Sequence, residues 1–304
     1  MRFVKFHGYG NDYLVFEATQ LSAAGWREGF ERFAAGDAFH DFVRRVCDRH
    51  YGAGSDGVAV VERLAEGGAA DFRLRIFNPD GGVAAMSGNG SRCAASYLHF
   101  EGLWSGDELR FETRAGVKLY TRRGRAGARS FRFEAEIGRP RFDSASIPML
   151  TPAPLEEVRD YALVLPGGET LSVTALQMCN PNCCAFVRDL DEVDWRRLGR
   201  TIESHAAFPE RTNVEFIRVL DRGNIEARVW ERGAGETLSS GTGACAAAVA
   251  SMVGGHTDRH VTVSMPGGLL EVFWREDGEV LLTGTAEVVY RAEWLKEAAQ
   301  GEGV

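Results

Sequence analysis

Hydrophobic and polar residues alternate in many short runs along this 304-residue chain. Residues 71–77, D-F-R-L-R-I-F, and residues 225–230, I-E-A-R-V-W, place an apolar side chain at every second position. A period of two is typical of a strand with one buried face, because successive side chains point to opposite sides. The same criterion predicts strands at residues 57–62, 108–113, 117–121, 130–135, 172–178, 214–219, 260–264, 269–274 and 286–290.

Four other segments predict helices. Residues 93–100 and 244–253 are rich in alanine and poor in charge, so we expect them to form buried helices. Residues 39–50 and 195–205 predict helices on the surface. Many short strands with few helices favour an α+β fold, in which curved and mostly antiparallel sheets each surround one central helix.

Two glycine-rich segments resemble each other about half a chain apart. Residues 87–95 are S-G-N-G-S-R-C-A-A, and residues 240–248 are S-G-T-G-A-C-A-A-A. Each comes after an alternating run and leads into an alanine-rich one. A repeat at this spacing indicates a duplicated domain, because the period of a solenoid is only about 20–50 residues.

The domain boundary is predicted near residues 136–143, where Gly138 and Pro140 interrupt the pattern. We therefore expect two pseudo-symmetric domains. The first comprises residues 1–135, with residues 286–304 returning to it, and the second comprises residues 136–285.

Composition excludes several classes of protein. The net charge is −8 and no long basic run occurs, which argues against a nucleic-acid partner. No apolar run approaches the roughly 20 residues that span a bilayer, and the N-terminus lacks the pattern of a signal peptide. We expect no membrane association and a cytoplasmic location. The six cysteines form no paired C-x-x-C spacing, so we predict no metal site and buried, reduced thiols.

The two glycine-rich turns predict anion binding. A turn that opens a helix presents free backbone N–H groups, and the helix dipole favours negative charge there. The lysine of a phosphate-binding loop is missing, and Cys93 stands where a dinucleotide-binding turn has its third glycine. A pair of such turns, with nearby amides and acids, would suit a zwitterionic amino acid. The nearby polar residues are Asn11, Asp12, Asn78, Asp80, Asn180, Asn182, Asn213, Glu231, Arg232 and Glu236.

Four motifs together resemble the diaminopimelate epimerase family, over nearly the whole chain. Residues 5–13, K-F-H-G-Y-G-N-D-Y, resemble its K-M-H-G-x-G-N-D-F, and residues 49–57 resemble its R-x-x-G-I-G-x-D-G. Residues 78–93 are similar to N-x-D-G-S-x-x-x-x-C-G-N-G-x-R-C. Residues 230–243, W-E-R-G-A-G-E-T-L-S-S-G-T-G, are similar to Y-E-R-G-x-G-E-T-x-A-C-G-T-G.

This resemblance implies an epimerase that uses no cofactor, converts LL- to meso-diaminopimelate in lysine and peptidoglycan precursor synthesis, and forms a homodimer. In the family, two cysteines work on opposite faces of the substrate α-carbon, one as thiolate and one as thiol. The resemblance implies that Glu231 recognises the ammonium or assists a catalytic thiol, and that Arg232 pairs with the distal carboxylate. It implies substrate contacts for Asn11, Asn78, Gly88, Asn89, Gly90, Asn180, Asn213, Glu231, Arg232, Gly241 and Thr242.

Both positions of the family's catalytic cysteines are serine here, Ser87 and Ser240. A serine hydroxyl is a far weaker acid than a thiol, whose pKa is about 8.5 and can be lowered further. The family's histidine after Asn-Pro is also replaced, by Asn182. Cys93 and Cys245 lie inside the predicted helices, where we expect small buried core residues. The sequence therefore predicts impaired turnover.

Three hypotheses remain open at this point. The chain is an epimerase whose two thiols were replaced, with its binding residues intact. Alternatively, it is a divergent isomerase or dehydratase on the same scaffold, with Glu231, Glu236 or Asp80 as a carboxylate base. Thirdly, it binds an amino acid without chemistry.

Overall fold

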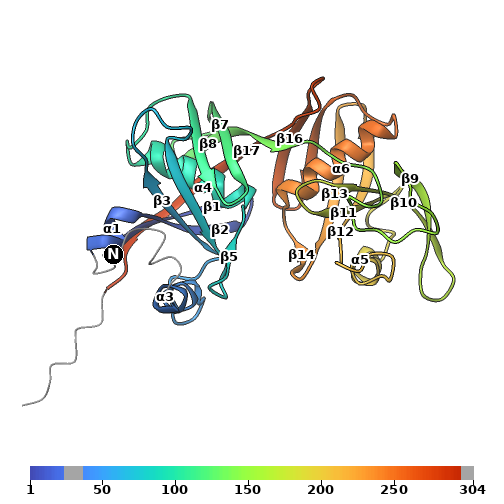
Figure 1. Cartoon of the computed structure of the whole chain (residues 1–304), viewed down its shortest axis with the longest axis horizontal. Helices are drawn as coiled ribbons and strands as arrows, with labels where there is room; N and C mark the ends of the chain where they lie inside the picture. The colour runs from blue at the N-terminus through green and yellow to red at the C-terminus, as the bar shows by residue number, and fades with distance from the viewer. Residues whose placement is uncertain (24–36, 296–304) are drawn as a thin grey trace, which may run out of the picture. The chain divides into compact units, whose positions relative to one another are not determined.

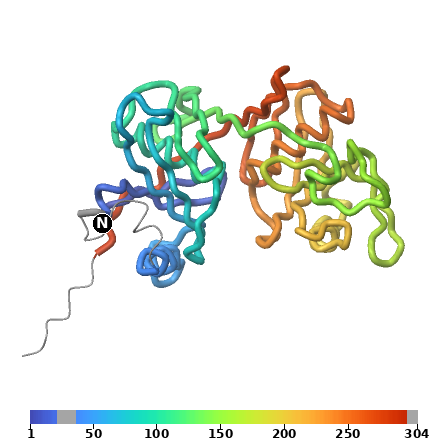
Figure 2. The backbone as a smooth tube through the Cα atoms, in the orientation of Figure 1, coloured from blue at the N-terminus to red at the C-terminus, as the bar shows by residue number. Residues whose placement is uncertain are grey.

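The computed structural model describes residues 1–23 and 37–295. The chain divides into two compact units, one of residues 1–133 with 285–304 and one of residues 134–284 (Figure 2). The segment predicted to return to the first domain, residues 286–304, is described as far as residue 295. Each unit is an α+β structure built from a mixed sheet and few helices (Figure 1).

The first unit is a sheet whose strands pair in the order β17, β1, β2, β3, β4, β6, β7. The β2–β3 and β4–β6 pairs are parallel and the others are antiparallel. Its strands are β1 (Arg2–Gly8), β2 (Asn11–Glu17), β3 (Val58–Arg63), β4 (Phe72–Phe77), β5 (Val83–Ala84), β6 (Glu108–Thr113) and β7 (Gly116–Arg125). Two further strands, β8 (Ser130–Gly138) and β17 (Val280–Glu293), belong to this unit only in part, β8 with its start and β17 with its end.

The second unit repeats this order of pairing, as β9, β10, β11, β12, β13, β15, β16. Here β11–β12 and β13–β15 are the parallel pairs. Since each unit has the same sequence of parallel and antiparallel neighbours, the two are copies of one pattern. The strands are β9 (Val158–Val164), β10 (Thr170–Gln177), β11 (Pro181–Phe186), β12 (Asn213–Asp221), β13 (Asn224–Glu231), β14 (Gly235–Thr237), β15 (His260–Met265) and β16 (Gly268–Trp274).

One long helix lies at the centre of each unit, α4 (Gly88–Phe100) in the first and α6 (Gly241–Val253) in the second. In each unit the helix packs against the inner strands of its own sheet (Figure 1). Both predicted helices extend further toward the N-terminus than their alanine-rich runs, because the glycine turns already form the first helical turn. Cys93 and Cys245 are fully buried in these helices, as predicted.

The remaining helices are α1 (Ala18–Ala23), α3 (Asp37–Cys47) and α5 (Trp195–Glu203). The predicted surface helices correspond to α3 and α5, each of which buries one face. No helix in the described part of the chain is both long and apolar enough to cross a membrane.

The sequence analysis missed strands that are buried on both faces. In β2 and β11 nearly every residue is buried, so no alternation marks them. One thiol also differs from expectation: Cys179 is exposed, in a turn where its φ is 64°, whereas the other five are buried.

Candidate functional site

In the first unit, Ser87 is the residue that caps helix α4. Its backbone is extended, and its Oγ accepts a hydrogen bond from the N–H of Gly90 at 3.1 Å. This arrangement satisfies one of the free N–H groups that every helix has at its start. The phenolic oxygen of Tyr13 lies 2.9 Å from the same Oγ. Ser87 is therefore held between the first helical turn and a tyrosine on β2.

The glycines around Tyr13 make room for its ring. A Cβ on Gly90 would lie 2.9 Å from Cε1 of that ring, and a Cβ on Gly57 would lie 2.7 Å from the same atom. Such distances are too short for real contacts, so only glycine fits at either place. The buried ring of Tyr13 is thereby fixed against the start of α4.

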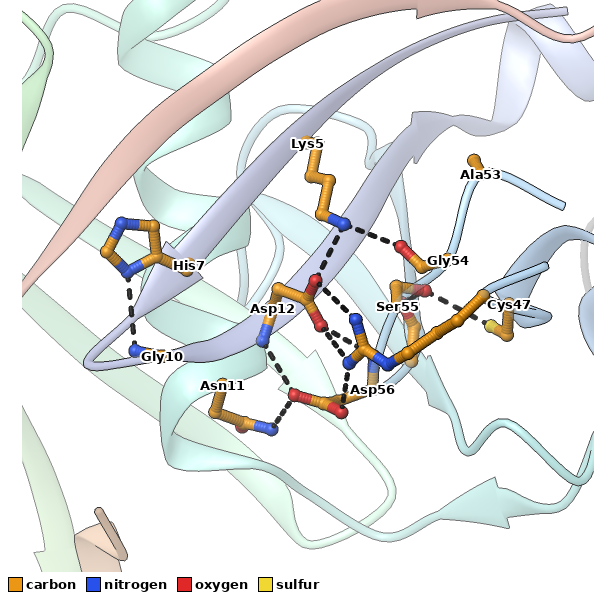
Figure 3. A network of polar contacts seen from close by, with 12 residues as sticks. Lys5, His7, Gly10, Asn11, Asp12, Cys47, Ala53, Gly54, Ser55 and Asp56 are labelled. Carbon is orange, nitrogen blue, oxygen red and sulfur yellow. Dashed lines mark hydrogen bonds and ion pairs between the residues drawn. The ribbon is translucent and has the colours of Figure 1, made fainter. Parts of the chain in front are cut away.

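A chain of amides leads away from the helix start. Asn89 donates from Nδ2 to Oδ1 of Asn11 at 3.1 Å. Asn11 in turn donates from its own Nδ2 to Oδ2 of Asp56 at 3.0 Å (Figure 3). The backbone N–H of Asp12 donates to the same carboxylate oxygen. Two predicted site residues, Asn11 and Asn89, are thus in direct contact.

Charged groups anchor this chain. Asp12 pairs with Lys5 at 2.7 Å and with Arg49 at 2.9 Å, and Arg49 also pairs with Asp56 at 2.7 Å. Burial alone would raise the pKa of Asp12, but the hydrogen bonds from Arg49 and Lys5 outweigh it and lower the pKa. The Asp12 carboxylate therefore stays ionised, and its ion pairs hold the β1–β2 hairpin in place.

In the second unit, Ser240 caps helix α6 in the same way. Its Oγ accepts the N–H of Gly243 at 3.2 Å, and its backbone is again extended. Gly241 and Thr242 form the first turn. Here the neighbour of the serine is a carboxyl group, because the Ser240 hydroxyl lies near enough to Glu231 to lower the pKa of that group.

Glu231 is the last residue of strand β13. Its Oε1 accepts a hydrogen bond from Oγ1 of Thr237 at 3.2 Å. Desolvation raises the pKa of Glu231, and the hydrogen bonds from Ser240 and Thr237 offset part of this effect. A carboxyl group with a raised pKa next to a hydroxyl is a candidate acid or base.

Amides also line the second helix start. Asn180 donates to Oγ1 of Thr242 at 3.4 Å, and Nδ2 of Asn182 donates to Oδ1 of Asn180 at 3.1 Å. Asn213 extends the chain, since its Nδ2 donates to Oδ1 of Asn182 at 3.2 Å and its Oδ1 accepts the N–H of Arg232 at 2.9 Å. The structure thus brings together four of the predicted residues of this unit, together with Asn182.

The side chain of Arg232 is exposed, and its Nη1 donates to the carbonyl of Glu210 at 3.0 Å. Its loop is held by the buried Glu203, which accepts the N–H of Gly233 at 2.7 Å and the indole N–H of Trp230 at 2.7 Å. The guanidinium is therefore presented on a loop that is fixed from behind.

Three candidate residues lie outside these contact chains. Asn78 and Asp80 are exposed in a turn after β4, where the side chain of Asp80 accepts the N–H of Gly82 at 2.7 Å. Glu236 is paired with Arg196 through two hydrogen bonds, of 2.6 and 2.7 Å, which lower its pKa. Glu236 therefore lacks the environment of a base that works near neutral pH.

Sequence reasoning missed three buried residues next to the helix starts. They are Tyr13, Arg92 on α4 and Glu215 on β12. Desolvation raises the pKa of Glu215 well above its usual value. Arg92 and Glu215 carried a signal, because each is a charged residue next to apolar or small residues in a predicted helix or strand.

The family model of diaminopimelate epimerase matches residues 3–133 and 174–289. A diaminopimelate epimerase from Pelotomaculum thermopropionicum is 42% identical over 303 residues, covering 97% of this chain and 99% of the relative. One from Desulforudis audaxviator is 41% identical over 302 residues, covering 97% of this chain and 100% of the relative.

Solved structures share the fold at low identity. A phenazine biosynthesis protein of the PhzF family from Bacillus anthracis matches with a TM-score of 0.66 at 16% identity, over 97% of this chain and 99% of that chain. A hydroxyproline epimerase from Agrobacterium vitis matches with a TM-score of 0.62 at 16% identity, over 96% and 91%. The sequence matches span both units, and the chain therefore belongs to the diaminopimelate epimerase family, and with it to the isomerases.

Proposed function

We propose that this chain is a cofactor-independent epimerase of the diaminopimelate type, in which Ser87 and Ser240 occupy the places of the acid–base cysteines. The observation that carries this proposal is the equivalence of the two serines. Each caps the central helix of its unit, and each Oγ accepts the N–H of the third helical residue. The identity of 42% to a curated epimerase supports the substrate class.

In this proposal the first turns of α4 and α6 supply N–H groups for the substrate's α-carboxylate and for the negative charge that develops at the α-carbon. Asn11, Asn78, Asn89, Asn180 and Asn213 hold its polar groups, and Glu231 receives the ammonium or assists Ser240. Arg232 pairs with the distal carboxylate, because its planar fork suits two parallel hydrogen bonds.

The serine pair limits the chemistry. Proton abstraction from carbon needs a group that titrates near the working pH, and a hydroxyl does not. We therefore expect slow turnover, with binding retained. We expect the protein to be a homodimer and to be located in the cytoplasm.

The experiment is α-proton exchange of diaminopimelate in deuterated water, followed by NMR. It compares this protein with the double variant Ser87→Cys/Ser240→Cys. The proposal predicts little exchange for the former, and fast exchange with epimerisation for the latter. If the double variant binds diaminopimelate but exchanges no proton, the acid–base assignment is wrong. If neither protein binds it, the substrate class is wrong.

One observation favours a second candidate, an isomerase with a carboxylate base. Burial raises the pKa of Glu231, which lies near Ser240, whereas Glu236 is neutralised by Arg196 and Asp80 is exposed. Exchange by the unmodified protein that disappears in Glu231→Gln would support this alternative.

A further inference from the structure

The side chain of Arg92 is fully buried inside the first unit, on the second turn of α4. Arginine almost never lies in a protein interior without a partner for its charge, because desolvating a cation is costly. Within the described part of the chain, no carboxylate forms an ion pair with Arg92, although many other arginines there have one.

The contacts of the guanidinium leave part of it unsatisfied. Nη2 donates to Oδ1 of Asn89, and the ring of Tyr9 lies 5.8 Å from the guanidinium carbon. Nε and Nη1 are buried and have no hydrogen-bond partner among the described residues. Two donor atoms therefore lack a hydrogen-bond partner, and the positive charge has no carboxylate partner among the described residues.

The guanidinium points to the start of its own helix. Nη1 lies 3.8 Å from the place where a Cβ on Gly88 would be, and Gly88 is the first residue of α4. Helical side chains lean toward the N-terminus, which explains how Arg92 reaches back one turn. Its charge thus adds to the positive end of the helix dipole.

Packing does not explain this residue. In the duplicated helix the position that corresponds to Arg92 is occupied by Cys245, which is also fully buried. The same fold therefore accepts a small apolar side chain at this place. The cation in the first unit serves another purpose.

We propose that Arg92 is the buried counter-charge for a carboxylate that binds at the first turn of α4. The identification of this anion as the α-carboxylate of an amino acid rests on the proposed function. Arg92 also fixes the amide chain. Nη2 of Arg92 donates a hydrogen bond to Oδ1 of Asn89. The Nδ2 group of Asn89 is therefore turned toward Asn11, and Nδ2 of Asn11 is turned toward Asp56.

The test uses Arg92→Met, which removes the charge at similar length, and Arg92→Lys, which keeps it. The control is Arg73→Met, which removes an arginine of β4 that pairs with Glu62 and Glu112. Thermal unfolding without ligand is measured first, followed by titration calorimetry with diaminopimelate.

We expect Arg92→Met to keep or raise the unfolding midpoint, because an uncompensated buried charge is removed. Its Kd for diaminopimelate should rise about tenfold or more, since a charge-assisted contact is lost, and Arg92→Lys should lose less. Arg73→Met should lower the midpoint and leave binding unchanged. If Arg92→Met lowers the midpoint as much as the control and binds normally, the charge is structural and the inference is overturned.

Inorganic sulfate separates this inference from the proposed function. Sulfate is compared with chloride at equal ionic strength, because sulfate also stabilises proteins nonspecifically. A sulfate-specific rise of the midpoint that is absent in Arg92→Met supports the anion site even if diaminopimelate does not bind. Diaminopimelate binding that is equal in this protein and in Arg92→Met upholds the proposed function and overturns the role of Arg92.

Discussion

The starts of helices α4 and α6 have the same backbone and different chemistry. Ser87 caps α4 with φ −137° and ψ 123°, and Ser240 caps α6 with φ −128° and ψ 125°. In each case the serine oxygen accepts the N–H of the third helical residue. The duplication has preserved the geometry that presents free N–H groups to an anion.

The side chains next to these two helix starts differ in their charge. The first has the phenol of Tyr13 and the buried cation of Arg92. The second has the carboxyl groups of Glu231 and Glu215, and burial raises the pKa of both. A duplicated backbone thus provides two similar helix starts. The residues around the first favour negative charge, and the residues around the second favour a bound proton.

The largest effect should come from removing the carboxyl group at the second start. In the Ser87→Cys/Ser240→Cys variant, Glu231→Gln should slow α-proton exchange by about 10²-fold or more, because a general acid–base group is lost. NMR in deuterated water measures the rate. The matched control is Glu236→Gln on the adjacent strand β14, which should stay within about twofold. Equal losses for both changes would remove Glu231 from its special role.

Alanine at the third helical residue should affect the two starts unequally. A Cβ on Gly90 would lie 2.9 Å from the Tyr13 ring, whereas a Cβ on Gly243 would lie 3.1 Å from a carboxyl oxygen of Glu215. Because the ring is fixed, Gly90→Ala should cost about 1–3 kcal/mol in the free energy of unfolding, and Gly243→Ala should cost less. Urea denaturation measures both. The reverse order would show that the first start is the more adaptable one.

A smaller effect should appear in the pH dependence of stability. Since burial raises the pKa of Glu215, the folded protein holds a proton there that the unfolded chain releases above about pH 4.3. The stability that Glu215 contributes is complete below that pH. It is lost as the pH rises toward the pKa that Glu215 has in the folded protein. Glu215→Gln should therefore gain stability relative to the parent between about pH 5 and about pH 8.

Thermal unfolding at several pH values measures this difference. The control is Glu276→Gln, which removes an exposed carboxyl group in the same way. If the difference in unfolding midpoint between Glu215→Gln and the parent shrinks as the pH rises, Glu215 is ionised in the folded protein.

The sequence predicted the duplicated architecture because its signals are local. The glycine turns, the alanine-rich runs and the alternation of β4 and β13 each appear within about ten residues. The doubly buried strands β2 and β11 have no such period and were missed. The contact between Tyr13 and Ser87 joins residues 74 positions apart, so no local pattern could indicate it.

The same reasoning explains which candidate residues could be found. Motif resemblance located the serines, the amides and Glu231, because these lie in the glycine-rich and asparagine-rich turns. The roles proposed for Arg92 and Glu215 depend on their burial and on side-chain atoms that have no hydrogen-bond partner among the described residues. Their charges are visible in the sequence, but these surroundings emerge only from the fold.

The most direct test of this comparison is α-proton exchange by the single variants Ser87→Cys and Ser240→Cys. A thiol at position 87 would precede Gly88, toward which the cation of Arg92 points, and a nearby cation favours thiolate. This variant would also leave Ser240 with its carboxyl neighbour. A thiol at position 240 would lie beside Glu231 and would leave Ser87 with only a phenol and a backbone N–H as its hydrogen-bond partners in the described structure. The account predicts that Ser87→Cys exchanges the proton about tenfold faster or more. Equal rates, or a faster Ser240→Cys, would contradict it.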